Sequence, residues 1–333
     1  MTYRNIETRE DTQAALELFN GCAASGEILY KPFADAESFE AFFLKRKEEG
    51  LKTVALIAAD RTAFASGCYM DGEEKGYISF VAVAPDQRRK GIGQEILRAL
   101  EQGLSSASDE RITKFEVIFF NPMNFTWVVP GTDGHDHPNA PGVDVGSMGY
   151  LFLKNCGYRD FAYQNSYHID LSDYQFSKDM ERRIASLKEK GIEITYYDGE
   201  KHSGLEELMD SFGNPLWKKE VLENAALPGG GDPLLIVNWN GKAMGFTGPL
   251  SVQESGRGFF CGIGVHKDCR GNGAGKALFA YLCAGLKDMD ARFMTLFTGE
   301  TNPARNIYEA AGFHIVRTWA DMRKELKKEG GKA

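Results

Sequence analysis

The sequence predicts two successive α/β domains, each an α+β arrangement of a mixed β-sheet with helices packed against it. Residues 77–102 and residues 259–284 both read as an apolar strand, a polar turn, a pair of glycines and an amphipathic helix. The segments around these two copies also follow one another in the same order. Since each helix crosses over between the strand before the glycines and the strand after them, these two strands are predicted to be parallel neighbours at the centre of the sheet.

Each half begins with two helical patterns, which are followed by a pair of short strands. The helical patterns are residues 11–23 and 37–50 in the first half, and residues 204–212 and 215–226 in the second. The paired strands are residues 51–60 and 62–70 in the first half, and residues 233–240 and 242–250 in the second. Turn-forming residues separate the strands of each pair, which indicates two β-hairpins.

After the glycines and their helix, each half continues with a strand, a short helix that ends in Gly-aromatic, and a final strand. The strands that follow the helix are residues 112–120 and 292–298, and the final strands are residues 163–171 and 314–322. A helical pattern over residues 176–190 links the halves. The domain boundary is therefore predicted near residue 173, which gives domains of residues 1–172 and 173–333.

Composition limits the classes of function that fit this chain. Its 333 residues are 43% hydrophobic and 26% charged, as expected for two globular domains. The net charge of -8 argues against nucleic acid and anionic membrane surfaces as partners. No apolar run has the length of a membrane span, and the polar N-terminus does not resemble a secretory signal. The six cysteines form no C-x-x-C pair, so free thiols in a reducing cytoplasm are expected.

The stretch CRGNGAGKALF, residues 269–279, places closely spaced glycines before a helix, as in phosphate-binding turns. A P-loop is excluded because Arg270 stands where its first glycine should be, and Ala277 where its hydroxyl residue should be. A dinucleotide fingerprint is excluded because its third glycine would fall on Lys276. The pattern that remains is Arg-x-x-Gly-x-Gly.

This pattern resembles the pyrophosphate loop of the GCN5-related N-acetyltransferases (GNAT), which bind acetyl-coenzyme A. Both halves contain it, as Arg88, Gly91 and Gly93 and as Arg270, Gly273 and Gly275. The resemblance covers nearly the whole chain, and its architecture is similar to that of tandem two-domain members such as mycothiol synthase. The resemblance implies two tandem acyl-CoA N-acyltransferase domains.

The resemblance also implies which residues bind acetyl-coenzyme A. The backbone of the strand that ends at Val265 would align the pantetheine arm and polarise the acetyl carbonyl, and the glycine loop would hold the pyrophosphate. The implied residues of the second half are Ile263, Val265, Arg270, Gly271, Asn272, Gly273, Ala274, Gly275, Lys276, Asn302 and Arg305. Those of the first half are Val83, Arg88, Arg89, Lys90, Gly91 and Gly93. For the first half, coenzyme binding without catalysis and a pure scaffold role both stay open.

Only the second half has the residues for catalysis. Within Leu296–Phe313, Tyr308 stands four residues before Gly-Phe, where the family's tyrosine protonates the coenzyme thiolate; a phenol with a pKa near about 10 suits that task. The first half has Leu153 at this position and is expected to be non-catalytic. The strand before the second loop lacks an acid, so Glu300 is the first candidate for the base that deprotonates the amine. Glu254, His266 and a water relay are alternatives.

The first half also has an insertion over residues 121–146. It is rich in Pro, Gly and aromatic residues, and Phe125 and Trp127 are candidates either to line a substrate cavity or to pack against the second half. Its cluster of Asp133, His135, Asp136 and His137 favours a hydrogen-bonded turn over a metal site, and no metal is predicted.

The sequence thus predicts an N-acetyltransferase that acts on the amine of a small molecule or peptide by direct attack in a ternary complex. A coenzyme-binding regulatory or scaffold protein is the alternative. An aminoacyl donor is a further one, disfavoured by the paired Gly-x-Gly loops. A homodimer is compatible with the sequence.

Overall fold

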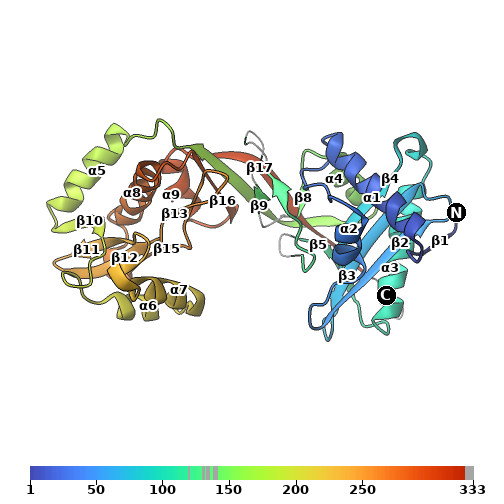
Figure 1. The fold of residues 1–333 in the computed structure, drawn as a ribbon, viewed down its shortest axis with the longest axis horizontal. Helices are drawn as coiled ribbons and strands as arrows, with labels where there is room; N and C mark the ends of the chain where they lie inside the picture. The colour runs from blue at the N-terminus through green and yellow to red at the C-terminus, as the bar shows by residue number, and fades with distance from the viewer. Residues whose placement is uncertain (119–120, 130–131, 133–135, 138–141, 327–333) are drawn as a thin grey trace, which may run out of the picture. The chain divides into compact units, whose positions relative to one another are not determined.

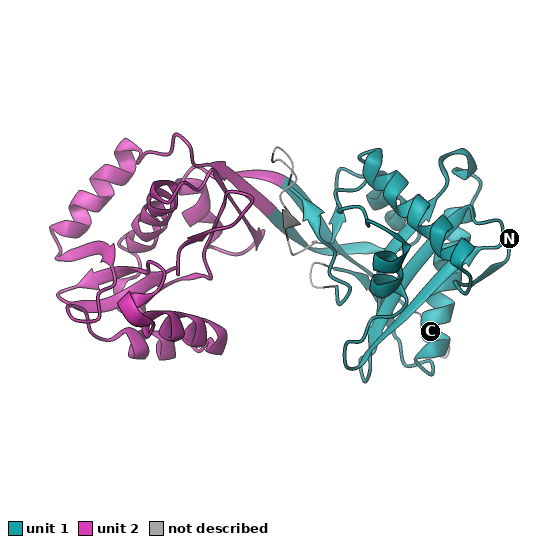
Figure 2. Ribbon diagram, in the orientation of Figure 1, with its two compact units in different colours: residues 1–165, 317–333 teal, residues 166–316 magenta. Residues whose placement is uncertain are grey.

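In the computed structural model, the chain is described over residues 1–118, 121–129, 132, 136–137 and 142–326. It divides into two compact units, residues 1–165 with 317–333 and residues 166–316 (Figure 2). These units are defined by spatial contacts and differ from the domains expected from the repeat, because the end of the chain belongs to unit 1. The domain boundary near residue 173 was inferred from the sequence repeat, and it stays a prediction. No helix in the described part of the chain is long and apolar enough to cross a membrane.

Unit 1 contains one mixed sheet with helices packed against it (Figure 1). Its strands run in the spatial order β1-β2-β3-β4-β5-β17-β9. The central elements, in chain order, are β1 (Tyr3–Asn5), α1 (Arg9–Ala24), α2 (Ala36–Phe43), β2 (Leu51–Ala58), β3 (Ala63–Met70), β4 (Lys75–Val83), α3 (Ile92–Ala107), β5 (Lys114–Val117), α4 (Met148–Asn155) and β9 (Arg159–Asp170). Short strands in the insertion are β6 (Trp127–Val128), β7 (Asp136–His137) and β8 (Val143–Asp144).

Unit 2 begins with the linking helix α5 and then follows the same order of elements as unit 1. Its elements are α5 (Lys178–Lys188), β10 (Ile192–Tyr196), α6 (Leu205–Phe212), α7 (Pro215–Ala225), β11 (Leu235–Trp239), β12 (Lys242–Thr247), β13 (Ser251–Val252), β14 (Arg257–Phe259), β15 (Ile263–Val265), α8 (Ala274–Asp288), β16 (Phe293–Gly299), α9 (Arg305–Ala310) and β17 (His314–Glu325). Strands β10-β11-β12-β15 form one group, and β9-β16-β14-β13 form another. The predicted hairpins are confirmed, as β2 with β3 and β11 with β12.

The predicted parallel pair is present in both units. In unit 1, β4 pairs with β5 from Lys75↔Lys114 to Tyr77↔Glu116. In unit 2, β14 pairs with β16 at Arg257↔Phe293 and Gly258↔Met294. After Phe259 the chain leaves its pairing with β16 and continues as β15, which pairs with β12 instead. A strand predicted as continuous is therefore interrupted over residues 260–262, and the parallel pairing ends at Gly258.

The last strand of the chain was expected to complete the second half, but most of it belongs to unit 1. Residues 322–325 of β17 pair antiparallel with β5, from Met322↔Val117 to Glu325↔Lys114. Likewise, the latter part of β9 belongs to unit 2, where β9 neighbours β16. Each unit is therefore completed by residues that the repeat assigns to the other half.

The insertion contributes aromatic rings to the core of unit 1. Phe125 stacks on Tyr30 with 4.6 Å between ring centroids, within a group of rings that includes Phe19 and Phe42. Trp127 is buried and packs edge-on against Trp319, at 5.3 Å between centroids. Both rings therefore serve the packing of unit 1, since Trp319 also lies in this unit.

The structure describes only part of the His/Asp cluster of the insertion. Asp133 and His135 lie outside the described residues, and only the backbone of Asp136 and His137 is described, as β7. No group of potential metal ligands occurs among the described residues. The hydrogen-bonded turn stays a prediction.

Candidate functional site

The glycine loop of unit 2 ends in a left-handed turn that leads into α8. Gly271 and Gly273 have φ values of +79° and +91°, a region that glycine adopts at little cost. Gly273 is the N-cap of α8 and supplies no side-chain acceptor for the first turn. Asn272 Oδ1 accepts a hydrogen bond from the Ala274 N–H at 3.0 Å. The other first-turn N–H groups have no acceptor within the helix, so the loop presents donors and a positive helix end to an anion.

The arginine of the motif has the same structural contact in both units. Arg270 Nε donates to the Val265 carbonyl at 2.8 Å, and Arg88 Nε donates to the Val83 carbonyl at 2.9 Å. Each bond joins the start of the loop to the end of the preceding strand. Part of each guanidinium is thus used to shape the turn, which positions the backbone N–H groups that follow.

The loop of unit 1 has the same backbone shape but a different charge environment. Gly91 has a φ of +86° and caps α3 without a side-chain acceptor. Both terminal nitrogens of Arg88 donate to the Glu27 carboxylate, at 2.7 and 2.9 Å. Within the described residues, Arg270 has no such acidic partner. A carboxylate next to the unit 1 loop makes that site less favourable for an anion.

Tyr308 lies on α9 with its ring in the core of unit 2. Its ring centroid is 5.0 Å from that of Phe279 on α8 and 6.2 Å from that of Tyr167 on β9. The residue is 9% exposed, and its hydroxyl makes no hydrogen bond to any described residue. Burial raises the pKa of the phenol above its usual value of 10.0. Tyr308 is therefore a protonated donor at neutral pH whose hydroxyl has no partner among these residues.

The corresponding position of unit 1 cannot supply such a donor. Leu153 is buried in the core formed by α3 and the sheet. The hydroxyl of Tyr150, one turn earlier on α4, donates to Asp160 at 2.8 Å and accepts from Lys154 at 3.1 Å. The position of Leu153 thus offers no hydroxyl, and the non-catalytic role of unit 1 stays a prediction.

The other candidate residues of unit 2 lie at the end of β16 and in the following turn. Glu300 is exposed, and its backbone carbonyl accepts from Arg305 Nη1 at 3.1 Å. Asn302 Oδ1 accepts from the Ala304 N–H at 3.0 Å. Both Asn302 and Arg305 thus shape the start of α9, which carries Tyr308. His266 caps the short turn before Arg270 and accepts from the Asp268 N–H at 3.4 Å.

Sequence reasoning missed Arg257 on β14. This residue is 7% exposed, and burial lowers the pKa of its guanidinium to about 10. It donates to the Thr295 hydroxyl at 2.8 Å and to the Thr295 carbonyl at 2.7 Å, and no described carboxylate pairs with it. Arg257 therefore joins β14 to β16 beside the last pair of the parallel strands. In the sequence, Arg257 could have been noticed as a charged residue at the start of the apolar run RGFF.

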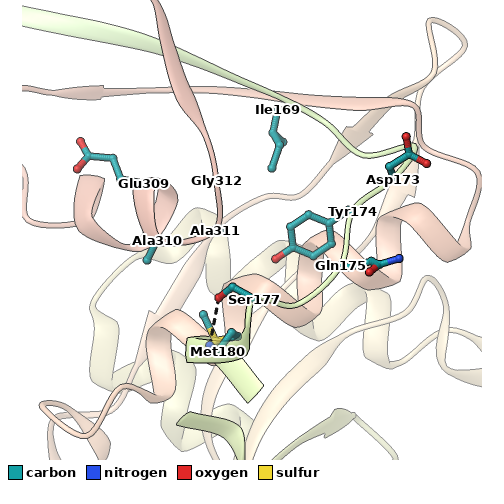
Figure 3. Close-up of a pocket in the computed structure, with 10 residues that line it drawn as sticks. All are labelled: Ile169, Asp173, Tyr174, Gln175, Ser177, Met180, Glu309, Ala310, Ala311 and Gly312. Atoms are coloured by element: carbon teal, nitrogen blue, oxygen red, sulfur yellow. Dashed lines mark hydrogen bonds between the residues drawn. The ribbon is translucent and has the colours of Figure 1, made fainter. Parts of the chain in front are cut away.

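A cavity of about 370 Å³ lies elsewhere in unit 2 (Figure 3). Its lining includes Ile169 near the end of β9, and Tyr174 and Ser177 before α5. Glu309 of α9 and Gly312, just after this helix, line it as well. None of the predicted site residues lines it. The candidate site is therefore defined by the glycine loop and Tyr308.

Comparison with known proteins decides the family. The sequence profile of the acetyltransferase (GNAT) family matches residues 10–122 and again residues 202–313. The chain belongs to this family. The two matches correspond to two GNAT domains, and the predicted fold class is confirmed. Membership supports acyl-CoA N-acetyltransferase activity in general terms. No curated protein matches the chain.

Solved structures of GNAT proteins share the fold at low sequence identity. A GCN5-related N-acetyltransferase from Sphaerobacter thermophilus is 17% identical with a TM-score of 0.55, and the match covers 97% of this chain and 95% of that one. A fungal multi-domain GH3 beta-N-acetylglucosaminidase with a GCN5-related glucosamine N-acetyltransferase region is 14% identical with a TM-score of 0.58. That match covers 97% of this chain, which spans 38% of the fungal protein. A tandem GNAT protein from the clavulanic acid biosynthesis pathway is 15% identical with a TM-score of 0.49, with coverage of 100% and 99%.

Proposed function

We propose that this chain is an acetyl-CoA-dependent N-acetyltransferase in which unit 2 transfers an acetyl group to the amine of a small molecule or peptide. The observation that carries the proposal is the buried Tyr308, on the helix that packs against α8. In the same unit, no carboxylate of the described residues lies beside the loop's Arg270. The proposal extends to a catalytic domain of residues 173–333, a non-catalytic domain of residues 1–172, and a cytoplasmic location.

The residues of the loop fit the diphosphate of coenzyme A. Positive φ at Gly271 and Gly273 lets the backbone approach a ligand, and the first-turn N–H groups of α8 supply donors. A tethered acetyl thioester would supply an activated carbonyl carbon. In the proposed site, the loop from Arg270 to Lys276 binds the diphosphate, and Ile263 and Val265 offer their backbone to the pantetheine arm.

The chain's own residues account for the two proton transfers. Glu300 is exposed at the end of β16 and is our candidate to take a proton from the substrate ammonium, either directly or through water. Tyr308 keeps its proton at neutral pH because burial raises its pKa, so it can donate that proton to the thiolate that leaves. The electron pair of the amine forms the amide bond as the C–S bond breaks.

A pair of glycine variants, one in each loop, tests which unit is catalytic. Gly273→Glu places bulk and negative charge in the unit 2 loop, whereas Gly91→Glu does the same in unit 1, and both positions have a similar positive φ. Acetylated products from a panel of amines and peptides, incubated with acetyl-CoA, are measured by mass spectrometry. We expect Gly273→Glu to abolish acetylation and Gly91→Glu to retain most of it. The reverse pattern would move catalysis to unit 1, and acetylation retained in both variants would refute the proposed site.

A further inference from the structure

The linking helix α5 carries an arginine on the side that faces unit 2. Met180 and Leu187 of α5 are buried in the core of this unit, and Ile184 packs against them. Arg183 occupies the i+3 position of this apolar stripe, where a hydrophobic residue is expected. Helix α5 packs against α8, and the side chain of Arg183 reaches Gly273 at the start of α8.

Arg183 lies directly on the glycine loop. A Cβ atom built on Gly273 would be 2.5 Å from Arg183 Nη1 and 2.8 Å from its Cδ. The glycine is therefore required at this position for space as well as for its φ of +91°. The guanidinium contacts the residue that caps α8.

The charge of Arg183 is poorly compensated where it lies. Its Nε is buried and has no hydrogen-bond partner among the described residues. The Arg183 side chain is 32% exposed, and its Nη2 is 3.5 Å from a carboxylate oxygen of Asp179. This contact is weak because the Asp179 side chain is 70% exposed. The guanidinium thus faces the positive end of α8 and its unpaired N–H groups, an arrangement that becomes favourable when an anion lies between them.

We propose that Arg183 is a coenzyme ligand that binds the diphosphate from the side opposite to the N–H groups of the unit 2 loop. This inference rests on the proposed function. A planar guanidinium forms paired, charge-assisted hydrogen bonds with phosphate oxygens, and its Nε can join in such a pair. The linking helix therefore contributes to the catalytic site of unit 2 as well as connecting the halves.

Unit 1 has no equivalent of this arginine. Among the described atoms, none lies within 4 Å of a Cβ built on Gly91. The neighbouring Arg88 is held by Glu27. The two loops thus share a backbone shape, and Arg183 makes unit 2 the tighter site for the diphosphate.

The test compares Arg183→Ala with Arg182→Ala in the full-length protein. Arg182 is the adjacent arginine of α5, is 76% exposed and contacts the same Asp179, so it is a matched control. Calorimetry measures the binding of acetyl-CoA, 3′-dephospho-coenzyme A and pantetheine. We expect Arg183→Ala to weaken both diphosphate-containing ligands by roughly 10- to 100-fold, the range for hydrogen bonds to charged groups. Pantetheine binding should be unchanged by Arg183→Ala, and Arg182→Ala should change no ligand more than about twofold.

Arg183→Lys keeps the positive charge but lacks the paired donors of the guanidinium, so we expect it to recover only part of the affinity for acetyl-CoA. The KM for acetyl-CoA is expected to rise from wild type through Arg183→Lys to Arg183→Ala. Equal acetyl-CoA affinity in wild type and Arg183→Ala would overturn this inference and leave the proposed function standing. Tighter binding in Arg183→Ala would also overturn it, because Arg183 would then cover the loop and oppose binding. Weakening that is confined to ligands with a 3′-phosphate would assign the arginine to that group instead. Wild-type protein that binds no acetyl-CoA would refute the proposed function and the inference together.

Discussion

Replacement of Tyr308 by phenylalanine is expected to lower kcat by roughly 100- to 10,000-fold, the usual contribution of a positioned general acid. The affinity for acetyl-CoA should change by less than about twofold, because the glycine loop is untouched and the hydroxyl has no partner among the described residues whose loss would disturb α9. Steady-state kinetics and calorimetry on the same preparations measure the two effects. Tyr150→Phe, on the equivalent helix of unit 1, is the control and should leave kcat unchanged.

The pH dependence of turnover tests the same role. General acid catalysis requires the protonated phenol, and burial raises the pKa of Tyr308 above 10.0. Activity is therefore lost through this group only as the pH rises above about 10, and full donor capacity is present at every lower pH. A rate that is equal in wild type and Tyr308→Phe across the whole pH range would exclude Tyr308 as the acid.

Replacement of Lys324 by methionine is expected to destabilise unit 1 by about 3–5 kcal/mol, the usual cost of leaving a buried charge unpaired. Lys324, on β17, donates to both carboxylate oxygens of Glu101 on α3, at 2.6 and 2.9 Å. Glu101 is 7% exposed and also accepts from the Tyr158 hydroxyl at 2.9 Å. The lysine therefore neutralises a carboxylate that has little access to water.

Denaturant unfolding with hydrogen exchange measures the size and the place of this effect. In Lys324→Met we expect faster exchange of backbone amide hydrogens in α3 and β5, although these elements are far from Lys324 along the sequence. Lys201→Met removes an exposed ion pair with Asp198 in unit 2 and should cost less than about 1 kcal/mol. Glu101→Gln combined with Lys324→Met should recover part of the loss. Faster exchange confined to unit 2 would contradict the assignment of β17 to unit 1.

Much of the fold could be predicted because the chain repeats itself. The hairpins and the parallel pairs follow from local patterns and from the crossover rule, and both are present in the structure. The return of β17 to unit 1 could not be predicted in this way. The alternation of apolar residues along a strand indicates which side chains face a core, but it does not identify the neighbouring strand. A register with β5 or with a strand of the second half satisfies the same pattern.

The candidate site was predictable to a similar extent. The glycine spacing predicted a turn that opens a helix, and such turns lead into α3 and α8. The roles of Tyr308 and Leu153 stay predictions. Arg183 and Arg257 were not predicted, because their surroundings depend on how α5 packs against α8 and on where the pairing of β14 with β16 ends. In both cases a charged residue in an apolar pattern was the visible signal.

Titration calorimetry of acetyl-CoA into wild type, Gly273→Glu and Gly91→Glu shows directly which loop binds the coenzyme. We expect wild type to have a site in unit 2 that disappears in Gly273→Glu and remains in Gly91→Glu. A second, weaker site that disappears with Gly91→Glu would show that unit 1 also binds coenzyme and serves as a non-catalytic partner. Undiminished binding in Gly273→Glu, or no binding in wild type, would contradict the assignment of the unit 2 loop to the coenzyme diphosphate.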